Sequence, residues 1–181
     1  TRTPQRTDHI EASYRGDISG AREALSGAGA NLDLALAAGR EAAKLVSQMR
    51  DLARAAVSGD DATRAAASEK FAALLDQYGQ TVNGAIAGGA GVLAGEAVTV
   101  SVDPDAPPVT VQGYDLRLKD QPGAEDVLRL SSSSTLSNPT AAADAARGAE
   151  ASMARLDTAL SRLSGASHRL ASHDTFLSTL D

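Results

Sequence analysis

The sequence predicts a mainly α fold, an elongated rod of long antiparallel heptad helices with a small β-hairpin region. Apolar or small residues recur every seven residues near each end of the chain, which is typical of helices packed side by side. Between these stretches valines alternate with polar residues, which favours short strands. The 181 residues fit one domain: N-terminal helices and a glycine-rich turn (9–94), a β-hairpin region and loop (95–138) and a long C-terminal helix (139–181).

The first helix is predicted from about Ile10 to Ser58, after an extended or frayed lead-in over residues 1–8. Gly27, Gly29 and Gly39 each cost about 1 kcal/mol of helix propensity relative to alanine. We therefore expect a neighbouring helix to approach closely at these glycines, and a helix break at Gly27–Gly29 is the alternative. The two core positions of the heptad are Ile18, Leu25, Leu32, Gly39, Val46 and Ala53, and Ala21, Ala28, Ala35, Ala42, Met49 and Ala56.

A second, antiparallel helix is predicted from about Ala62 to Thr81, because Gly59 can end the first helix and only a short link follows. Asp60 or Asp61 is its expected N-cap, since a carboxylate there accepts hydrogen bonds from free backbone N–H groups of the first turn. The apolar stripe of this helix consists of Phe71, Leu74, Leu75, Tyr78 and Val82.

The middle of the chain changes from a helical period to a period of two. Asn83-Gly84 is expected to open a glycine-rich connection that runs to Gly95. The alternation that follows predicts a β-hairpin or a three-stranded meander, and residues 119–138 are expected to be irregular, with a short element at 127–130. The alternating apolar residues are Val98, Val100, Val102, Val109, Val111, Leu116 and Leu118.

The last helix is predicted to begin at Asn138-Pro139, with Asn138 as N-cap and Pro139 at the first helical position. The pattern is still running at Asp181, and the chain begins at Thr1 without methionine, so we expect further segments on both sides. One core position is Ala142, Ala149, Leu156, Leu163, Leu170 and Leu177. The second is Ala146, Met153, Leu160, Ser167 and Asp174, whose polar end indicates a weaker seam or a change of partner.

The composition argues against several classes of function. The formal net charge is −6, whereas a nucleic-acid partner requires a basic face, so we expect none. The absence of cysteine excludes disulfides and thiolate metal sites. The chain has no apolar run of about 18 residues and no visible signal peptide, so we expect no helix to span a membrane.

We expect neither enzymatic activity nor a cofactor or metal site. Residues 89–94 read G-x-G-x-x-A, but they follow a predicted helix and precede a predicted strand, which reverses the order of a dinucleotide site. His168 and His173 are five residues apart and lie on different faces of a helix, unlike the i, i+4 pairs of zinc helices. The acidic residues are scattered along helix faces rather than paired.

The outer face of the first helix is the candidate contact surface for another subunit or a receptor, and a simple solvated face is the alternative. Asp51 and Arg54 are three residues apart and can form a weak ion pair, worth about 0.2–0.5 kcal/mol. The candidate contact residues are Gln48, Arg50, Asp51, Leu52 and Arg54.

Several motifs, in their order and spacing, resemble one known family. They are residues 31–39 (NLDLALAAG), 48–53 (QMRDLA), 71–78 (FAALLDQY), 156–163 (LDTALSRL), 168–170 (HRL) and 172–177 (SHDTFL). With them the chain resembles bacterial flagellin, the filament subunit of the flagellum, and especially the short flagellins of alphaproteobacteria. The resemblance covers nearly the whole chain after about residue 8.

The resemblance implies a flagellin outer-core domain whose polymerising terminal helices would lie before Thr1 and after Asp181. It implies a structural, self-assembling and motility-related role, an extracellular location on the flagellum, and export without a cleaved signal. Other flagellin subunits are the expected partners, together with an export chaperone and the filament cap, and a fragment without the terminal helices is expected to stay monomeric. A hook–filament junction protein, or a flagellin-like surface protein that binds polysaccharide or a host receptor, is the alternative.

The resemblance also bears on recognition by the vertebrate Toll-like flagellin receptor. Flagellins that this receptor detects carry an arginine-rich segment on the same helix, and Arg50 and Leu52 match it. Gln48 stands where such flagellins have a further arginine, and Asp51 replaces a longer acid. The resemblance therefore implies weak or absent receptor activation.

Overall fold

The structure, a computed structural model, describes residues 5–101 and 107–180. These residues form a mainly α fold with one small antiparallel sheet, which confirms the predicted fold class at that level. The elements in chain order are α1 (Gln5–Ser58), α2 (Asp61–Ala87), the 3-10 turn η1 (Gly91–Leu93), β1 (Val98–Val100), β2 (Val109–Val111) and α3 (Pro139–Ser178).

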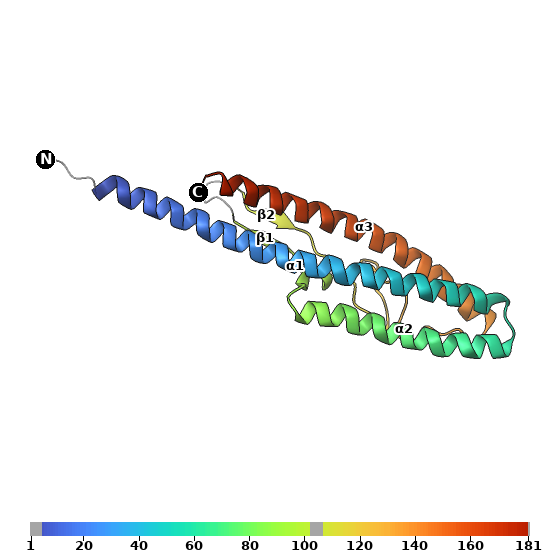
Figure 1. The fold of residues 1–181 in the computed structure, drawn as a ribbon. Coiled ribbons are helices and arrows are strands. Elements are labelled where there is room, and N and C mark those ends of the chain that lie inside the picture. Colours follow the sequence, from blue (N-terminus) through green and yellow to red (C-terminus); the bar gives the residue numbers. More distant parts are fainter. Residues whose placement is uncertain (1–4, 102–106, 181) are drawn as a thin grey trace.

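α1 is the central helix, and both other long helices pack against it (Figure 1). α3 runs antiparallel to α1. Arg22, in the first half of α1, pairs with Asp174 near the end of α3, and Arg54 near the end of α1 pairs with Glu150 in the first half of α3. α2 turns back along the second half of α1 (Figure 1). The second half of α1 is therefore covered by two helices.

The heptad seam predicted for α1 is confirmed, since every one of its twelve core positions from Ile18 to Ala56 is buried. Close helix approach is also confirmed at Gly39, where a Cβ atom would overlap Leu160 of α3. The same prediction is wrong for Gly27 and Gly29, whose Cβ atoms would meet nothing within 4 Å. The reason is that these two glycines lie beside the core positions rather than on them, and α1 continues through them without a break.

The predicted lead-in over residues 1–8 is wrong in its second half, because α1 already begins at Gln5. Residues 5–15 contain neither glycine nor proline, so nothing in them interrupts a helix. Residues 1–4 lie outside the described part of the chain.

α2 begins as predicted and ends later than predicted. Asp60 is the N-cap, and its Oδ1 accepts a hydrogen bond of 2.8 Å from the backbone N–H of Thr63. The helix passes through Asn83-Gly84 and ends at Ala87, because Val82 and Ala85 are buried and packing outweighs the low helix propensity of Gly84. Four members of the predicted stripe are buried, and Leu74 is partly buried.

The middle of the chain contains a two-stranded hairpin, so the alternative of a three-stranded meander is wrong. β1 and β2 pair antiparallel with Val98 opposite Val111 and Val100 opposite Val109. Val102 lies outside the described residues. Residues 112–138 contain neither helix nor strand, so the short element predicted at 127–130 is wrong as well. This irregular segment nevertheless contributes core residues, namely Leu116, Val127, Leu128, Leu130 and Leu136.

α3 begins as predicted, with the Asn138 side chain accepting a hydrogen bond of 2.8 Å from the backbone N–H of Ala141. Its first core position is buried throughout. The second is buried at Ala146 but only partly buried from Met153 to Asp174. Because α3 packs against the irregular segment as well as against α1, a neighbouring row is fully buried instead: Ala145, Ser152, Ala159 and Ala166.

Gly113→Ala is expected to lower the free energy of unfolding by about 1–3 kcal/mol, because a Cβ at this buried position would overlap the backbone of Gly95 and Glu96. Gly27→Ala is the matched control and should raise that free energy by about 0.5–1 kcal/mol, since its Cβ enters open space within a helix. Urea melts of both variants measure the two changes. The prediction fails when the two substitutions shift the midpoint in the same direction.

Candidate functional site

All five candidate contact residues lie on one stretch of α1, and the structure separates them by exposure. Gln48, Asp51 and Arg54 are exposed, as the heptad predicts. Arg50 is largely covered, with 24% of its side chain exposed, and Leu52 packs partly against the core. The outward-facing surface is therefore narrower than the five residues suggest.

The ion pair that the spacing allows between Asp51 and Arg54 is not formed, because each residue has a different partner. Asp51 Oδ1 accepts hydrogen bonds from Arg50, of 3.1 Å from Nε and 3.0 Å from Nη2. Arg54 reaches across to α3, where its Nε lies 3.0 Å from Oε1 of Glu150. A neighbouring helix offers Arg54 an acceptor that sequence spacing along α1 could not indicate.

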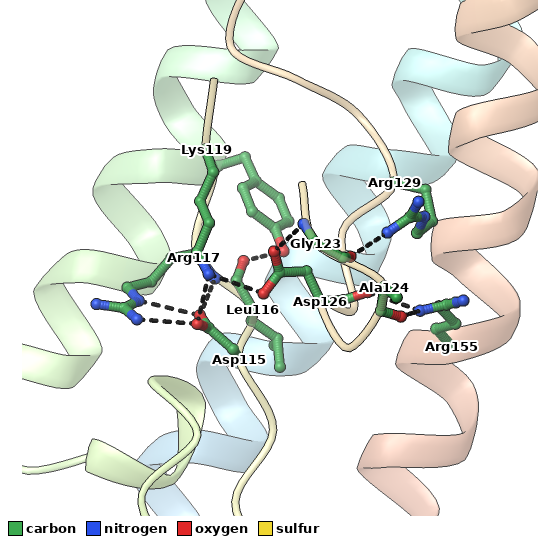
Figure 2. A network of polar contacts seen from close by, with 10 residues as sticks. Asp115, Leu116, Arg117, Lys119, Gly123, Ala124, Asp126, Arg129 and Arg155 are labelled. Atoms are coloured by element: carbon green, nitrogen blue, oxygen red, sulfur yellow. Dashed lines mark hydrogen bonds and ion pairs between the residues drawn. The ribbon is translucent and has the colours of Figure 1, made fainter. Parts of the chain in front are cut away.

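A second polar cluster, which no sequence pattern indicated, lies in the irregular segment between α2 and α3 (Figure 2). Lys119 Nζ lies 2.8 Å from Asp115 Oδ2 and 2.8 Å from Asp126 Oδ1, so one ammonium bridges two carboxylates. Arg117 donates to Asp115 at 3.0 Å from Nε and 2.8 Å from Nη2. The backbone N–H of Gly123 donates to Asp126 Oδ2 at 2.6 Å. We call Asp115, Lys119 and Asp126 the carboxylate clamp.

Hydrogen bonds to both flanking helices position the clamp. On the α2 side, the buried Tyr78 hydroxyl donates to the carbonyl of Leu116 at 2.6 Å. On the α3 side, Arg155 Nη1 donates to the carbonyls of Ala124 at 2.9 Å and Asp126 at 2.8 Å (Figure 2). Also on α3, the Ser152 hydroxyl accepts from the backbone N–H of Arg129 at 2.7 Å and donates to the carbonyl of Gly148. Side chains of α2 and α3 thus help to hold the irregular segment. Backbone hydrogen bonds contribute as well, such as those from Leu116 N–H to the carbonyl of Leu93 at 2.8 Å and from Val127 N–H to the carbonyl of Asp115 at 3.0 Å.

Hydrogen bonds between the charged groups of the clamp favour their ionised forms. Hydrogen bonds from Arg117 and then from Lys119 hold the pKa of Asp115 well below its usual range. The hydrogen bond from Lys119 likewise lowers the pKa of Asp126, and the two carboxylates raise the pKa of Lys119. Burial raises the pKa of Tyr78. Because each pKa shift within the clamp favours the charged form, the ion pairs of the clamp help to hold the segment in place.

Because of the clamp, we expect the free energy of unfolding to fall in acid. Unfolded aspartates have a pKa of about 3.9, so the stabilisation from Asp115 and Asp126 is complete above that pH and is lost as the pH falls towards their lowered folded-state pKa values. Urea melts at pH 6, 4 and 3 should show a falling free energy of unfolding. An Asp115→Asn, Asp126→Asn double variant, compared at the same three values, should show a smaller fall. An equal fall in both proteins would contradict the prediction.

The described residues provide little for a metal or cofactor. They contain no group of three His, Cys, Asp or Glu side chains that could hold a metal ion, and none of their helices has the length and hydropathy to cross a bilayer. His168 is exposed and His173 partly buried on α3. Residues 89–94 follow α2 and precede β1, the order that the sequence indicated. A hollow of about 310 Å³ between α1 and α3 is lined by Leu25, Gly29, Leu170, Asp174 and their neighbours.

Comparisons with known proteins bring no assignment. No protein-family model matches the chain, and no curated protein is significantly similar to it.

Proposed function

We propose that this chain is the core of a flagellar filament subunit, an extracellular structural protein of the flagellin type that assembles with copies of itself. The proposal starts from the ordered motifs shared with short flagellins. A mainly α arrangement with one small hairpin agrees with the rod-like outer core expected of that family. The partner expectations, namely other subunits, an export chaperone and the filament cap, belong to the same proposal.

The observation that carries the proposal is the antiparallel α1–α3 pair. About half of its buried residues are alanines, which allow close approach of two long helices, and the Leu160 side chain lies directly against Gly39. α1 begins and α3 ends at the same end of the molecule (Figure 1). In a flagellin, the two polymerising segments adjoin these same helix ends, so this geometry would bring both segments to one side of the subunit.

Immunogold electron microscopy of the source bacterium tests the proposal. Antibodies raised against the purified chain should label the flagellar filament along its whole length, and a strain lacking the corresponding gene is the control. Label confined to the joint between hook and filament would replace the proposal with a junction protein. Label on the cell body alone would replace it with a surface-binding protein.

The chain is expected to give no response at picomolar concentration in cells that report on the Toll-like flagellin receptor. Arg50, which matches the receptor-detected segment, is held by Asp51, and Gln48 cannot supply the additional positive charge. A Gln48→Arg, Asp51→Glu double variant should increase the response, because it restores the charge pattern that detected flagellins carry. A full picomolar response from the parent chain would refute this expectation.

A further inference from the structure

Met153 of α3 lies at the edge of the α1–α3 contact, with its sulfur against a cation of α1. Arg50 Nη1 donates to Met153 Sδ at 3.4 Å, while the same guanidinium donates to Asp51 at 3.0 Å. Met153 is partly buried. Met49, the other methionine of the chain, is 0% exposed in the α1 seam. As a residue, Met153 is therefore more accessible to a dissolved reagent than Met49.

We propose that Met153 is a site of sulfoxide formation by hydroperoxides, and that Arg50 retains the oxidised side chain in the helix contact. The Met153 sulfur attacks the terminal peroxide oxygen, an S–O bond forms and the O–O bond breaks. The departing oxygen takes up the proton of the attacked hydroxyl group, so hydrogen peroxide is reduced to water. Sulfur loses two electrons and the peroxide gains them, and no other reactant is required.

Arg50 matters because a sulfoxide oxygen is a much stronger acceptor than a thioether sulfur. Oxidation turns an apolar side chain into a polar one, which destabilises a packed contact unless a donor is present. The guanidinium already in contact with Met153 is such a donor, and a charged donor makes the stronger hydrogen bond. The new oxygen competes with Asp51 for Arg50, so oxidation alters the charge pattern of the exposed face of α1. This inference does not depend on the proposed function.

The site preference is tested by limited treatment of the folded chain with hydrogen peroxide, followed by peptide mass spectrometry over time. Met153 should gain one oxygen at least about tenfold faster than Met49, because attack on Met49 requires the seam to open. Urea-unfolded chain is the control and should lose this difference. Equal rates in the folded chain, or faster oxidation of Met49, would overturn the proposal.

The role of Arg50 is tested by comparing the melting temperatures of reduced and oxidised protein. In Arg50→Ala the loss on oxidation should exceed that of the parent by about 4 °C or more, because the sulfoxide lacks its charged donor. Arg50→Lys, which keeps a charge, and Arg54→Ala, which removes an exposed arginine paired elsewhere, should behave like the parent. Met153→Leu should show no shift. An equal loss in Arg50→Ala and the parent would show that Arg50 has no such role.

Discussion

Leu156→Ala is expected to lower the free energy of unfolding by about 2–5 kcal/mol, through lost burial and a residual cavity. Leu156 is 0% exposed at the first core position of α3. Six of the twelve core positions of α1 are alanines, whose side chains have no rotamers that could move into the space. The site should therefore collapse poorly. Urea denaturation followed by circular dichroism measures the change, with the midpoint expected to fall at an unchanged slope.

Leu180→Ala is the matched control, because it makes the same chemical change just beyond α3 at a residue that is 44% exposed. Its effect should stay within about 0.5 kcal/mol, as for most surface substitutions. Similar midpoints for the two variants would mean that the α1–α3 seam does not stabilise the fold.

Lys119→Met is expected to lower the free energy of unfolding, by less than the loss of a fully buried ion pair would. Removing the ammonium leaves the carboxylates of Asp115 and Asp126 facing each other, and the Asp126 side chain is only 8% exposed. Breaking a fully buried ion pair costs about 3–5 kcal/mol, and the loss should be smaller here because 35% of the Lys119 side chain is exposed. Urea melts at neutral pH measure the change.

Two comparisons separate the loss of the clamp from the loss of a surface charge. Lys70→Met on the exposed face of α2 should change the free energy of unfolding by less than about 0.5 kcal/mol. The cost of Lys119→Met should shrink in melts near pH 4, where the unpaired carboxylates can take up protons. A cost that is the same at both pH values would indicate lost packing of the lysine stem and not lost charge pairing.

The carboxylate clamp could not be predicted from sequence patterns. Asp115, Arg117 and Lys119 alternate along the chain, an acid followed by bases two and four residues later, and this was the only local signal. Its meaning depends on Asp126 and on Tyr78, which lies 38 residues before its hydrogen-bond acceptor Leu116. An irregular segment has no period, so burial of its side chains cannot be inferred from spacing.

The candidate contact surface could be predicted from the sequence only in part. Periodicity placed Gln48, Asp51 and Arg54 on the outside of α1, and this is confirmed. Periodicity could not show that Arg54 pairs with Glu150, 96 residues away, or that Arg50 contacts Met153. A long charged side chain can pair with any acceptor within reach. Acceptors on another helix come within reach only when the two helices have packed.

The mainly α class, the core positions of α1 and the cap at Asn138 could be predicted from the sequence, and the cap of α2 could be narrowed to Asp60 or Asp61, because heptad burial and capping are local properties of a chain. Three features could not be predicted from the sequence: how far α2 extends, which second row of α3 is buried, and how residues 112–138 are held. These features depend on contacts between segments distant in sequence. There, burial of Val82 and Ala85 and hydrogen bonds from Tyr78 and Arg155 outweigh local preference.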